Sequence, residues 1–209
     1  MHPSRRRRFV TAFVLATVAA ASGLRAQSSA DNAADAERLI KALEIHAGSV
    51  VGEIGAGDGA LSLVIARAVG DTGRVYSNEL NKDRLKGIGA AAEKAHVTNV
   101  TPIEGREAET NFPDACCDAI FMRNVYHHFG DPPAMNASLL KSLKPGGRLA
   151  ILDFTPPPGK DTAPPGKRGE DGQHGVTPPT VEQELKAAGF EILSSSLSNR
   201  TVFVVARRP

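Results

Sequence analysis

The sequence predicts an α/β fold: one seven-stranded, mostly parallel sheet with one antiparallel strand and helices on both faces. Three observations lead to this prediction. From Asp31 onward, short apolar runs alternate with helical segments, as in strand–helix–strand units. The chain closes with two strand-like runs joined by a short turn, and such a turn joins antiparallel strands. A length of 209 residues with 41% hydrophobic and 23% charged residues suits one soluble domain and excludes disordered and multi-span membrane proteins.

The first four elements follow from apolar spacing and glycine boundaries. A helix is expected over Ala34–Ile45, because its leucines and isoleucine recur on one face. The run Ser49–Ile54 is bounded by glycines and predicts a strand. A helix over Ala60–Val69 and a strand over Arg74–Asn78 come next.

The middle of the chain continues the alternation. We expect a helix over Asn81–Lys94 and strands over Asn99–Ile103 and Asp118–Arg123. The helix Pro132–Leu143 should stop at the turn Lys144-Pro145-Gly146-Gly147, because proline does not continue a helix. The apolar run Arg148–Phe154 then predicts a buried strand.

The last part of the chain contains a long loop and the closing pair of strands. Residues 155–175 hold five prolines and five glycines in 21 residues, which predicts a lid-like loop. Its Lys160, Lys167 and Arg168 are expected to face solvent. A helix over Thr180–Ala188 precedes the strands Phe190–Leu197 and Val202–Ala206, so one strand of the sheet must run antiparallel.

Residues 1–26 have the pattern of a cleaved signal peptide. Arg5–Arg8 precede the uncharged stretch Phe9–Gly23, and Ala26 offers a small residue for cleavage. The apolar stretch is too short for a stable membrane span, so no stable membrane insertion is expected after cleavage. Arg6-Arg7-x-Phe9-Val10 resembles a twin-arginine signal, although the ordinary secretory route stays open. The expected location is the periplasm or cell envelope.

Removal of this leader changes the charge of the chain. The whole chain has 25 basic and 23 acidic residues, a net charge of +2. Five of the arginines lie in residues 1–26, which contain no acid, so 20 basic residues remain against 23 acidic ones, a charge of −3. Residues 27–209 therefore form a single, mildly acidic domain for which no nucleic-acid partner is expected.

The two cysteines, Cys116 and Cys117, are adjacent in the sequence. A bridge between neighbours closes a small strained ring, so we expect no disulfide framework and interpret both as small hydrophobic residues.

The clearest motif is the strand-to-helix turn Glu53-Ile54-Gly55-Ala56-Gly57-Asp58-Gly59. Its glycines let the backbone turn tightly and let a ligand approach closely. The spacing also fits a dinucleotide-binding turn, with Glu79 placed to hold a ribose. Glu53 and Asp58 disfavour a pyrophosphate and favour a ligand that carries a positive centre or an amino group.

With Glu79, the loop before the fourth strand and Lys144-Pro145-Gly146-Gly147, this turn resembles the class I S-adenosylmethionine-dependent methyltransferases, which have a Rossmann-like fold. The resemblance spans about residues 35–207. It implies S-adenosylmethionine as the cofactor, with the glycine turn beside its methionine part and Glu79 on both ribose hydroxyls. Glu107, after the third strand, is the candidate for the adenine amino group, and Asn124 also falls among the implied cofactor residues. The implied cofactor set is Glu53, Gly55, Ala56, Gly57, Asp58, Gly59, Glu79, Glu107 and Asn124.

The segment after the fourth strand contains the candidate catalytic residues. His127 and His128 lie at the rim where the resemblance places the methyl acceptor, and either imidazole is suited to take a proton near neutral pH. With Asp153 and His174 they also form a candidate metal site. Because no local ligand motif is present, packing and hydrogen bonding are the preferred roles and no metal is expected. Tyr126 and Phe129 are expected in the core or against the cofactor.

The sequence therefore predicts an exported methyltransferase that acts at O, N or C of a small organic acceptor, since no substrate domain is inserted. A nicotinamide-dependent oxidoreductase and a non-catalytic binding protein of the same fold are the alternatives. The oligomeric state is not predicted.

Overall fold

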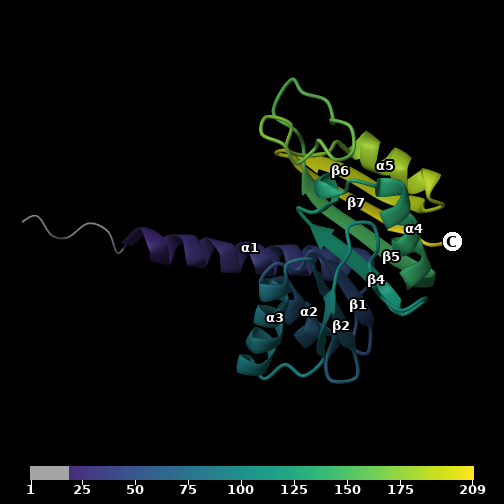
Figure 1. Cartoon of the computed structure of the whole chain (residues 1–209). Coiled ribbons are helices and arrows are strands. Elements are labelled where there is room, and N and C mark those ends of the chain that lie inside the picture. The colour runs from purple at the N-terminus through teal and green to yellow at the C-terminus, as the bar shows by residue number, and fades with distance from the viewer. Residues whose placement is uncertain (1–18) are drawn as a thin grey trace, which may run out of the picture.

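Seven strands form one sheet in the order β3-β2-β1-β4-β5-β7-β6 in the computed structural model, which describes residues 19–209. The strands are β1 (Val50–Ile54), β2 (Arg74–Glu79), β3 (Val100–Glu104), β4 (Cys117–Arg123), β5 (Leu143–Phe154), β6 (Glu191–Ser198) and β7 (Thr201–Arg207). The helices are α1 (Ala19–Leu43), α2 (Ala60–Val69), α3 (Lys82–Lys94), the 3-10 turn η1 (Tyr126–His128), α4 (Pro132–Ser142) and α5 (Pro178–Ala187) (Figure 1).

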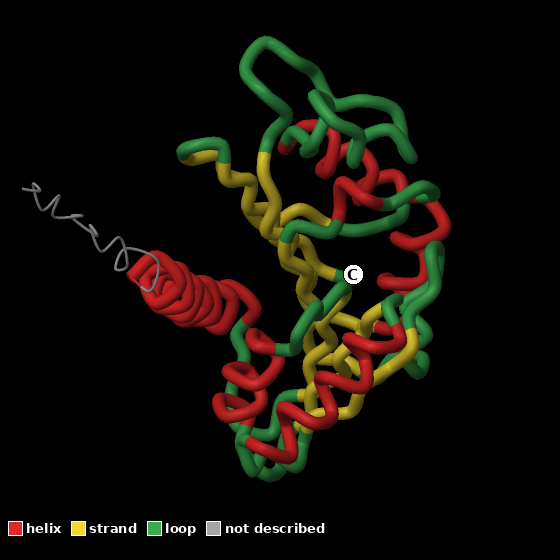
Figure 2. The backbone as a smooth tube through the Cα atoms, turned by 60° about the vertical axis from the view of Figure 1, so that its left-hand side comes forward, coloured by secondary structure: helices red, strands yellow, loops and turns green. Residues whose placement is uncertain are grey.

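Helices cover both faces of the sheet (Figure 2). Side chains alternate along a strand, so Ala119 and Phe121 of β4 face α1 and α2, while Ile120 and Met122 face α4 and α5. Both sets are fully buried, as expected of a central strand covered on both faces.

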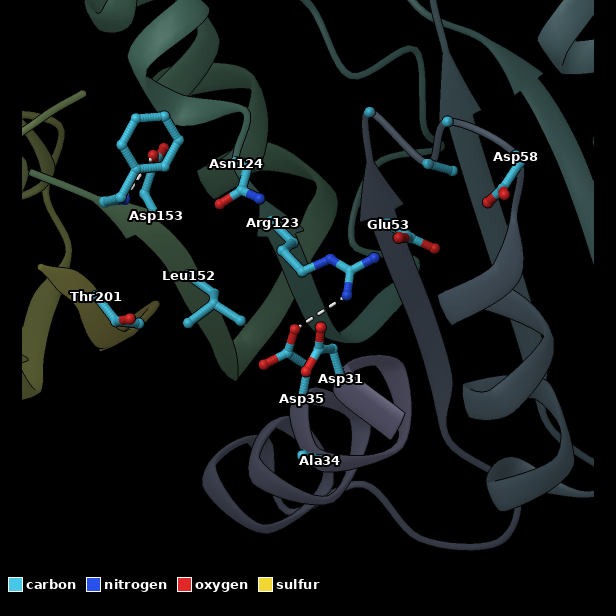
Figure 3. Close-up of a pocket in the computed structure, with 14 residues that line it drawn as sticks. Asp31, Ala34, Asp35, Glu53, Asp58, Arg123, Asn124, Leu152, Asp153 and Thr201 are labelled. Atoms are coloured by element: carbon cyan, nitrogen blue, oxygen red, sulfur yellow. Dashed lines mark hydrogen bonds and ion pairs between the residues drawn. The ribbon is translucent and has the colours of Figure 1, made fainter. Parts of the chain in front are cut away.

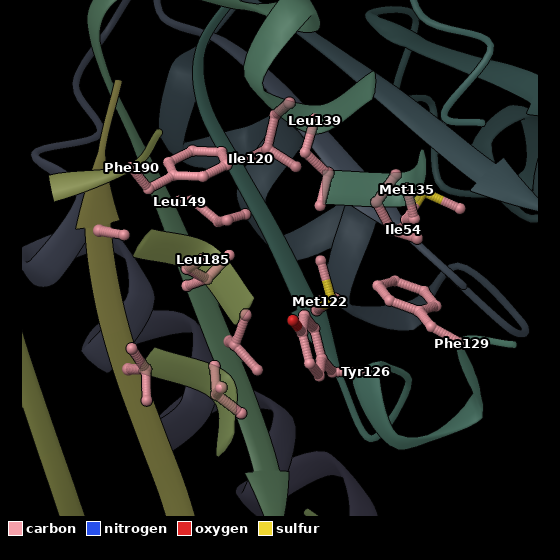
Figure 4. Packing of buried hydrophobic residues seen from close by; sticks show 14 of the residues in the cluster. Ile54, Ile120, Met122, Tyr126, Phe129, Met135, Leu139, Leu149, Leu185 and Phe190 are labelled. Carbon is pink, nitrogen blue, oxygen red and sulfur yellow. The ribbon is translucent and has the colours of Figure 1, made fainter. Parts of the chain in front are cut away.

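The core on the α4 and α5 side extends under the rim of the sheet. Tyr126 and Phe129 pack there with their ring centroids 5.0 Å apart, beside Met122 and Met135 (Figure 4). Both aromatic rings are buried. Of the two predicted places, the core or against the cofactor, the structure confirms the core for both rings, and Phe129 also lines a cavity.

The strand directions confirm the predicted fold class. Strands β1 to β5 pair in parallel, whereas β7 pairs antiparallel with both β5 and β6. Strand order reverses at β1, which lies between β2 and β4. Ligands of open parallel sheets bind at such a switch point, outside the carboxyl ends of the strands.

The starts of α1 and β5 differ from the expected positions by more than two residues. Helix α1 begins at Ala19 and not at Ala34, so it runs across the predicted cleavage point; residues 1–18 of the predicted leader lie outside the described residues. Strand β5 begins at Leu143, because Leu143 pairs with Cys117 before a register shift, so the predicted Lys144–Gly147 turn is an irregularity within this strand. Within residues 19–209, no helix has both the length and the apolar character needed to span a membrane.

The expectation for the cysteines is wrong. Cys116 and Cys117 form a disulfide bond with each other. Cys116 precedes β4, and the strand register shifts between Cys117 and Ala119. The bond therefore lies where the chain enters β4.

Candidate functional site

The candidate site lies at the carboxyl rim of the sheet, where β1, β2, β4 and β5 end at the switch in strand order. The glycine turn Gly55–Gly59 follows β1 and leads into α2. Glu79 ends β2, Arg123 ends β4, and Asp153 lies one residue before the end of β5. The topology thus gathers residues that are up to 100 positions apart in the sequence.

The glycine turn needs its glycines for two different reasons. Gly55 has φ +68°, and a Cβ there would lie 2.5 Å from the Val125 side chain, so the turn packs closely against the segment after β4. Gly57 has φ +60°, yet a Cβ there would meet nothing within 4 Å. The backbone at Gly57 therefore borders open space, which is suited to a ligand lying against it.

The other residues of the turn fix its position between β2 and α2. The Ala56 N–H donates to the Asn78 carbonyl at 2.8 Å. The Asp58 carboxylate accepts from the Ala60 N–H at 3.1 Å, at the start of α2. A Cβ at Gly59 would press on Ile88 of α3, at 3.1 Å.

Glu79 is buried and held in a fixed orientation. Its Oε2 accepts from the Gly57 N–H at 2.8 Å, and its Oε1 accepts from the Asn81 N–H at 2.9 Å. A carboxylate oxygen has two lone pairs, so each oxygen keeps one acceptor position. Glu79 is thus able to accept hydrogen bonds from two adjacent hydroxyl groups.

Glu53 lies beneath the turn and is only 3% exposed. Burial raises the pKa of its carboxyl from 4.5 to about 7, and this shift is opposed by the Ser62 hydrogen bond and by the charge of Arg123. The Ser62 hydroxyl donates to Glu53 and also lies 2.7 Å from the Ser77 hydroxyl. A positively charged group brought close to Glu53 would favour its ionised form.

Two cavities adjoin at this rim and share Gly55, Arg123 and Asn124 as lining residues. The larger has a volume of about 830 Å³ and contains Glu79, Glu107 and His128. The smaller, about 510 Å³, contains Glu53, Asp58 and Asp153 (Figure 3). Ligand pockets of proteins typically measure about 300–1,000 Å³, so both are large enough for parts of one extended ligand.

The larger cavity combines charged groups with an apolar surface. Glu107 is exposed on its wall, beyond Glu79. Leu80, which follows Glu79, is 56% exposed and lines the same cavity. An exposed leucine beside acceptor groups is suited to a flat, partly apolar ring with polar edges.

Sequence reasoning missed the groups that α1 brings to the smaller cavity. Asp35 Oδ2 accepts from Arg123 Nη1 at 2.9 Å, and Asn32 Oδ1 accepts from the same nitrogen at 2.6 Å. Figure 3 shows the Arg123 guanidinium turned toward Asp35. Arg123 could have been found from the sequence, because it is a charged residue at the end of a buried strand. No sequence pattern indicated its partners on α1.

Asn124 connects the two cavities. It has φ +57°, a conformation that asparagine adopts more readily than most residues. Its backbone N–H donates to the Leu152 carbonyl at 2.8 Å, which joins the end of β4 to β5. The predicted cofactor residues therefore all lie at this rim, from Glu53 to Asn124.

The structure separates the two candidate catalytic histidines. The His127 side chain is 1% exposed, and its Nδ1 lies 2.8 Å from Asp153 Oδ1. His128 is exposed and lines the larger cavity. Partial burial, together with the neighbouring His127 and His174, lowers the pKa of His128, so its ring is neutral at pH 7 and able to accept a proton.

The loop after β5 packs against His128 and is anchored by Arg168. The expectation that Arg168 faces solvent is wrong: it is 3% exposed and forms two hydrogen bonds with Glu184 of α5, at 3.1 and 2.5 Å. Its Nε also donates to the Ala163 carbonyl at 2.9 Å. This loop, which lies at the top of Figure 1, brings the His174 ring to 4.8 Å from that of His127.

Residues 52–151 match a family of methyltransferase domains. The chain is 34% identical over 111 residues to the ubiquinone/menaquinone biosynthesis C-methyltransferase UbiE of Shewanella halifaxensis (strain HAW-EB4). That alignment covers 53% of this chain and 44% of the relative, so the chain matches less than half the length of this curated relative.

Solved structures share the fold over most of the chain. A SAM-dependent methyltransferase from Aquifex aeolicus superimposes with a TM-score of 0.71 at 24% identity, over 84% of this chain and 90% of the other. Geranyl diphosphate C-methyltransferase from Streptomyces coelicolor A3(2), solved with Mg²⁺, geranyl diphosphate and S-adenosyl-L-homocysteine, gives 0.69 at 14% identity, over 85% and 80%. The predicted Rossmann-like methyltransferase fold is confirmed.

Proposed function

We propose that the chain is an S-adenosylmethionine-dependent methyltransferase that acts on a small organic acceptor, at O, N or C. The observation that carries the proposal is the pair of adjoining cavities: Gly57 borders open space in the smaller, and Glu79 keeps two acceptor positions in the larger. The methyltransferase-domain match over residues 52–151 supports the same activity.

The residues present fit this cofactor. Glu79 would accept from the two ribose hydroxyls, and Glu107 would accept from the adenine amino group, with Leu80 against the ring. Glu53 and Asp58 lie on the smaller cavity, where their charge suits the amino group and the positive sulfur. When bound, the cofactor supplies a methyl group on a positively charged sulfur.

The task of the protein is then to align the acceptor and to exclude water. Holding two reactants in line is worth on the order of 7 kcal/mol or more in favourable cases. The loop anchored by Arg168 packs against His128 through Gly169, and Asn124 lies where the two cavities join. His128 takes the proton of an acceptor that must lose one, while His127 is held against Asp153.

The activity is tested with cofactor labelled in its methyl group. We expect purified protein to transfer label to a small molecule in a cell-envelope extract, and excess S-adenosylhomocysteine to block the transfer. If the protein binds labelled cofactor but transfers none of the label, it is a binding protein and not an enzyme. Binding of NAD in preference to S-adenosylhomocysteine would instead indicate an oxidoreductase.

We further propose that the chain is exported and that residues 1–26 are removed. The arginine run and the apolar stretch that follows support this proposal. Cleavage after Ala26 would keep Asp31 and Asp35, which line the smaller cavity. N-terminal sequencing of the protein from the periplasm should therefore begin at Gln27; a chain that retains Arg5–Arg8 in the cytosol would contradict the proposal.

A further inference from the structure

Three histidines from two segments meet at the rim. His127 and His128 belong to η1, which follows β4, and His174 comes from the loop between β5 and α5. Each offers a ring nitrogen, and the three nitrogens lie within 4.8 Å of one another. The ring centroids of His127 and His128 are 4.0 Å apart, and those of His128 and His174 are 5.4 Å apart.

His127 supplies a second, independent observation. Its Nδ1 faces the carboxylate of buried Asp153, which only accepts hydrogen bonds when it is ionised, so the proton of the neutral ring lies on Nδ1. Its Nε2 is then an acceptor, and this buried atom has no hydrogen-bond partner in the described part of the chain. Leaving a buried polar atom unpaired typically costs about 1–3 kcal/mol, which a bound cation would offset.

The hydrogen bond between His127 and Asp153 is of the kind that metal-binding histidines usually make. A metal-binding histidine usually donates its other ring N–H to a carboxylate, which fixes the ring and strengthens the ligand. Asp153 is itself held, because its Oδ1 accepts from the Phe154 N–H at 2.8 Å and its Oδ2 accepts from the His127 N–H at 3.2 Å. Asp153 therefore holds the His127 ring in one orientation, with Nδ1 against the carboxylate.

We propose that His127, His128 and His174 bind one divalent transition-metal ion, with Zn²⁺ as the best fit. Three neutral imidazoles suit Zn²⁺, and three protein ligands leave a fourth position for water or substrate.

The geometry needs only a small adjustment. Zn–N bonds of roughly 2.0–2.1 Å in a tetrahedral site place the nitrogens about 3.3 Å apart, against a present limit of 4.8 Å. His128 and His174 are exposed and are able to change rotamer, whereas His127 is fixed. Gly169 lies directly against His128, since a Cβ there would be 2.7 Å from Nδ1, so the loop that carries His174 also packs on His128.

The metal site goes beyond the proposed methyl transfer and does not depend on it. His128 would then act as a ligand and not as a base. A cation at this rim would lower the pKa of a hydroxyl group bound at its open position, as zinc does for bound water. The acceptor would thus be activated directly by the ion.

The test is direct binding of Zn²⁺ to the untagged full chain. Calorimetric titration with zinc chloride should give one ion per chain. Loss of a residue that only orients a metal ligand typically lowers metal affinity roughly 10–100-fold. His174→Ala removes a ligand itself, so it should weaken binding by at least about 100-fold. His96→Asn is the matched control, because His96 is exposed, lies outside the cluster and has φ +53°, which asparagine tolerates.

Cobalt gives a second readout that does not require activity. Co²⁺ bound to the wild type should give the visible absorption of a low-coordinate site, which His128→Ala and His174→Ala should lose and His96→Asn should keep. Both variants change exposed residues, so circular dichroism should show a folded protein. Absence of one-to-one binding to the wild type, or equal affinity in His174→Ala, would overturn the proposal. Either result would leave the expected S-adenosylhomocysteine binding and the separate label-transfer test of the proposed function unaffected.

Discussion

Glu53, a residue of the proposed cofactor site, shows how one buried carboxyl makes stability depend on pH. Its pKa of about 7 in the folded protein exceeds the ordinary value of 4.5. The folded state therefore holds this proton more tightly than the unfolded state does. The stability contributed by the neutral form is complete below pH 4.5 and is lost as the pH rises through 7.

This pH dependence is measurable with Glu53→Gln. A shift from 4.5 to about 7 corresponds to about 3 kcal/mol. The free energy of unfolding of the wild type, minus that of the variant, should therefore fall by about this amount between pH 4.5 and 7. Urea unfolding at several pH values gives this difference, in which other groups cancel. A difference that stays constant with pH would contradict the burial of an ionisable Glu53.

Alanine substitution at Gly57 and at a control glycine distinguishes the cost of backbone strain from the loss of ligand binding. An alanine at this φ of +60° costs about 1–2 kcal/mol, but its Cβ would project into the space proposed for the cofactor. Gly146 is a matched control, with φ +79°, open space around its Cβ and a place near the start of β5, away from the rim. We expect both alanine variants to lose similar stability, but only Gly57→Ala to lose affinity for S-adenosylhomocysteine. Similar affinities in the two would place the cofactor elsewhere.

The meeting of the proposed cofactor residues at one rim was predictable, because the glycine motif and Glu79 each follow or end a strand in the sequence. The glycine turn follows an apolar run, and Glu79 ends the next one, so the topology brings them together. His127 and His128 were not separable in this way. Only the folded chain shows that Asp153, 26 residues later, fixes one of them, whereas the other faces a cavity.

The loop between β5 and α5 is the element whose sequence gave the least guidance. Its prolines and glycines correctly indicated a long irregular segment, but its anchor was misjudged. Arg168 is buried because Glu184, on the following helix, provides the opposite charge, and Tyr126 also donates to that carboxylate at 2.9 Å. A partner 16 residues away on another element leaves no local pattern.

Two neighbouring charges of this loop give a matched pair of variants. Arg168→Ala leaves Glu184 partly buried without its cation, and breaking such a pair costs about 3–5 kcal/mol. Lys167→Ala removes an exposed ion pair with Glu170, so its effect should be small. Thermal unfolding and limited proteolysis of the loop should separate the two variants. Equal stability would show that the Arg168 pair does not hold the loop.

At the scale of the whole molecule, the order of the strands explains why the site lies where it does. The reversal at β1 opens the rim between β2 and β4, and the antiparallel β7 closes the sheet beside β5. The alternation of apolar runs was sufficient to predict this class of sheet. The extent of α1 and the Cys116–Cys117 bond depended on backbone details that the pattern does not contain.

The most direct test of the central claim is calorimetric titration of S-adenosylhomocysteine into the wild type, Glu79→Ala and Glu104→Ala. Glu104 is the control, because it ends the neighbouring strand β3 and its side chain forms an exposed ion pair with Lys82. Hydrogen bonds to a charged group contribute about 1.5–3 kcal/mol. We therefore predict one-to-one binding to the wild type and to Glu104→Ala, and at least about 10-fold weaker binding to Glu79→Ala. Unchanged affinity in Glu79→Ala would contradict the account.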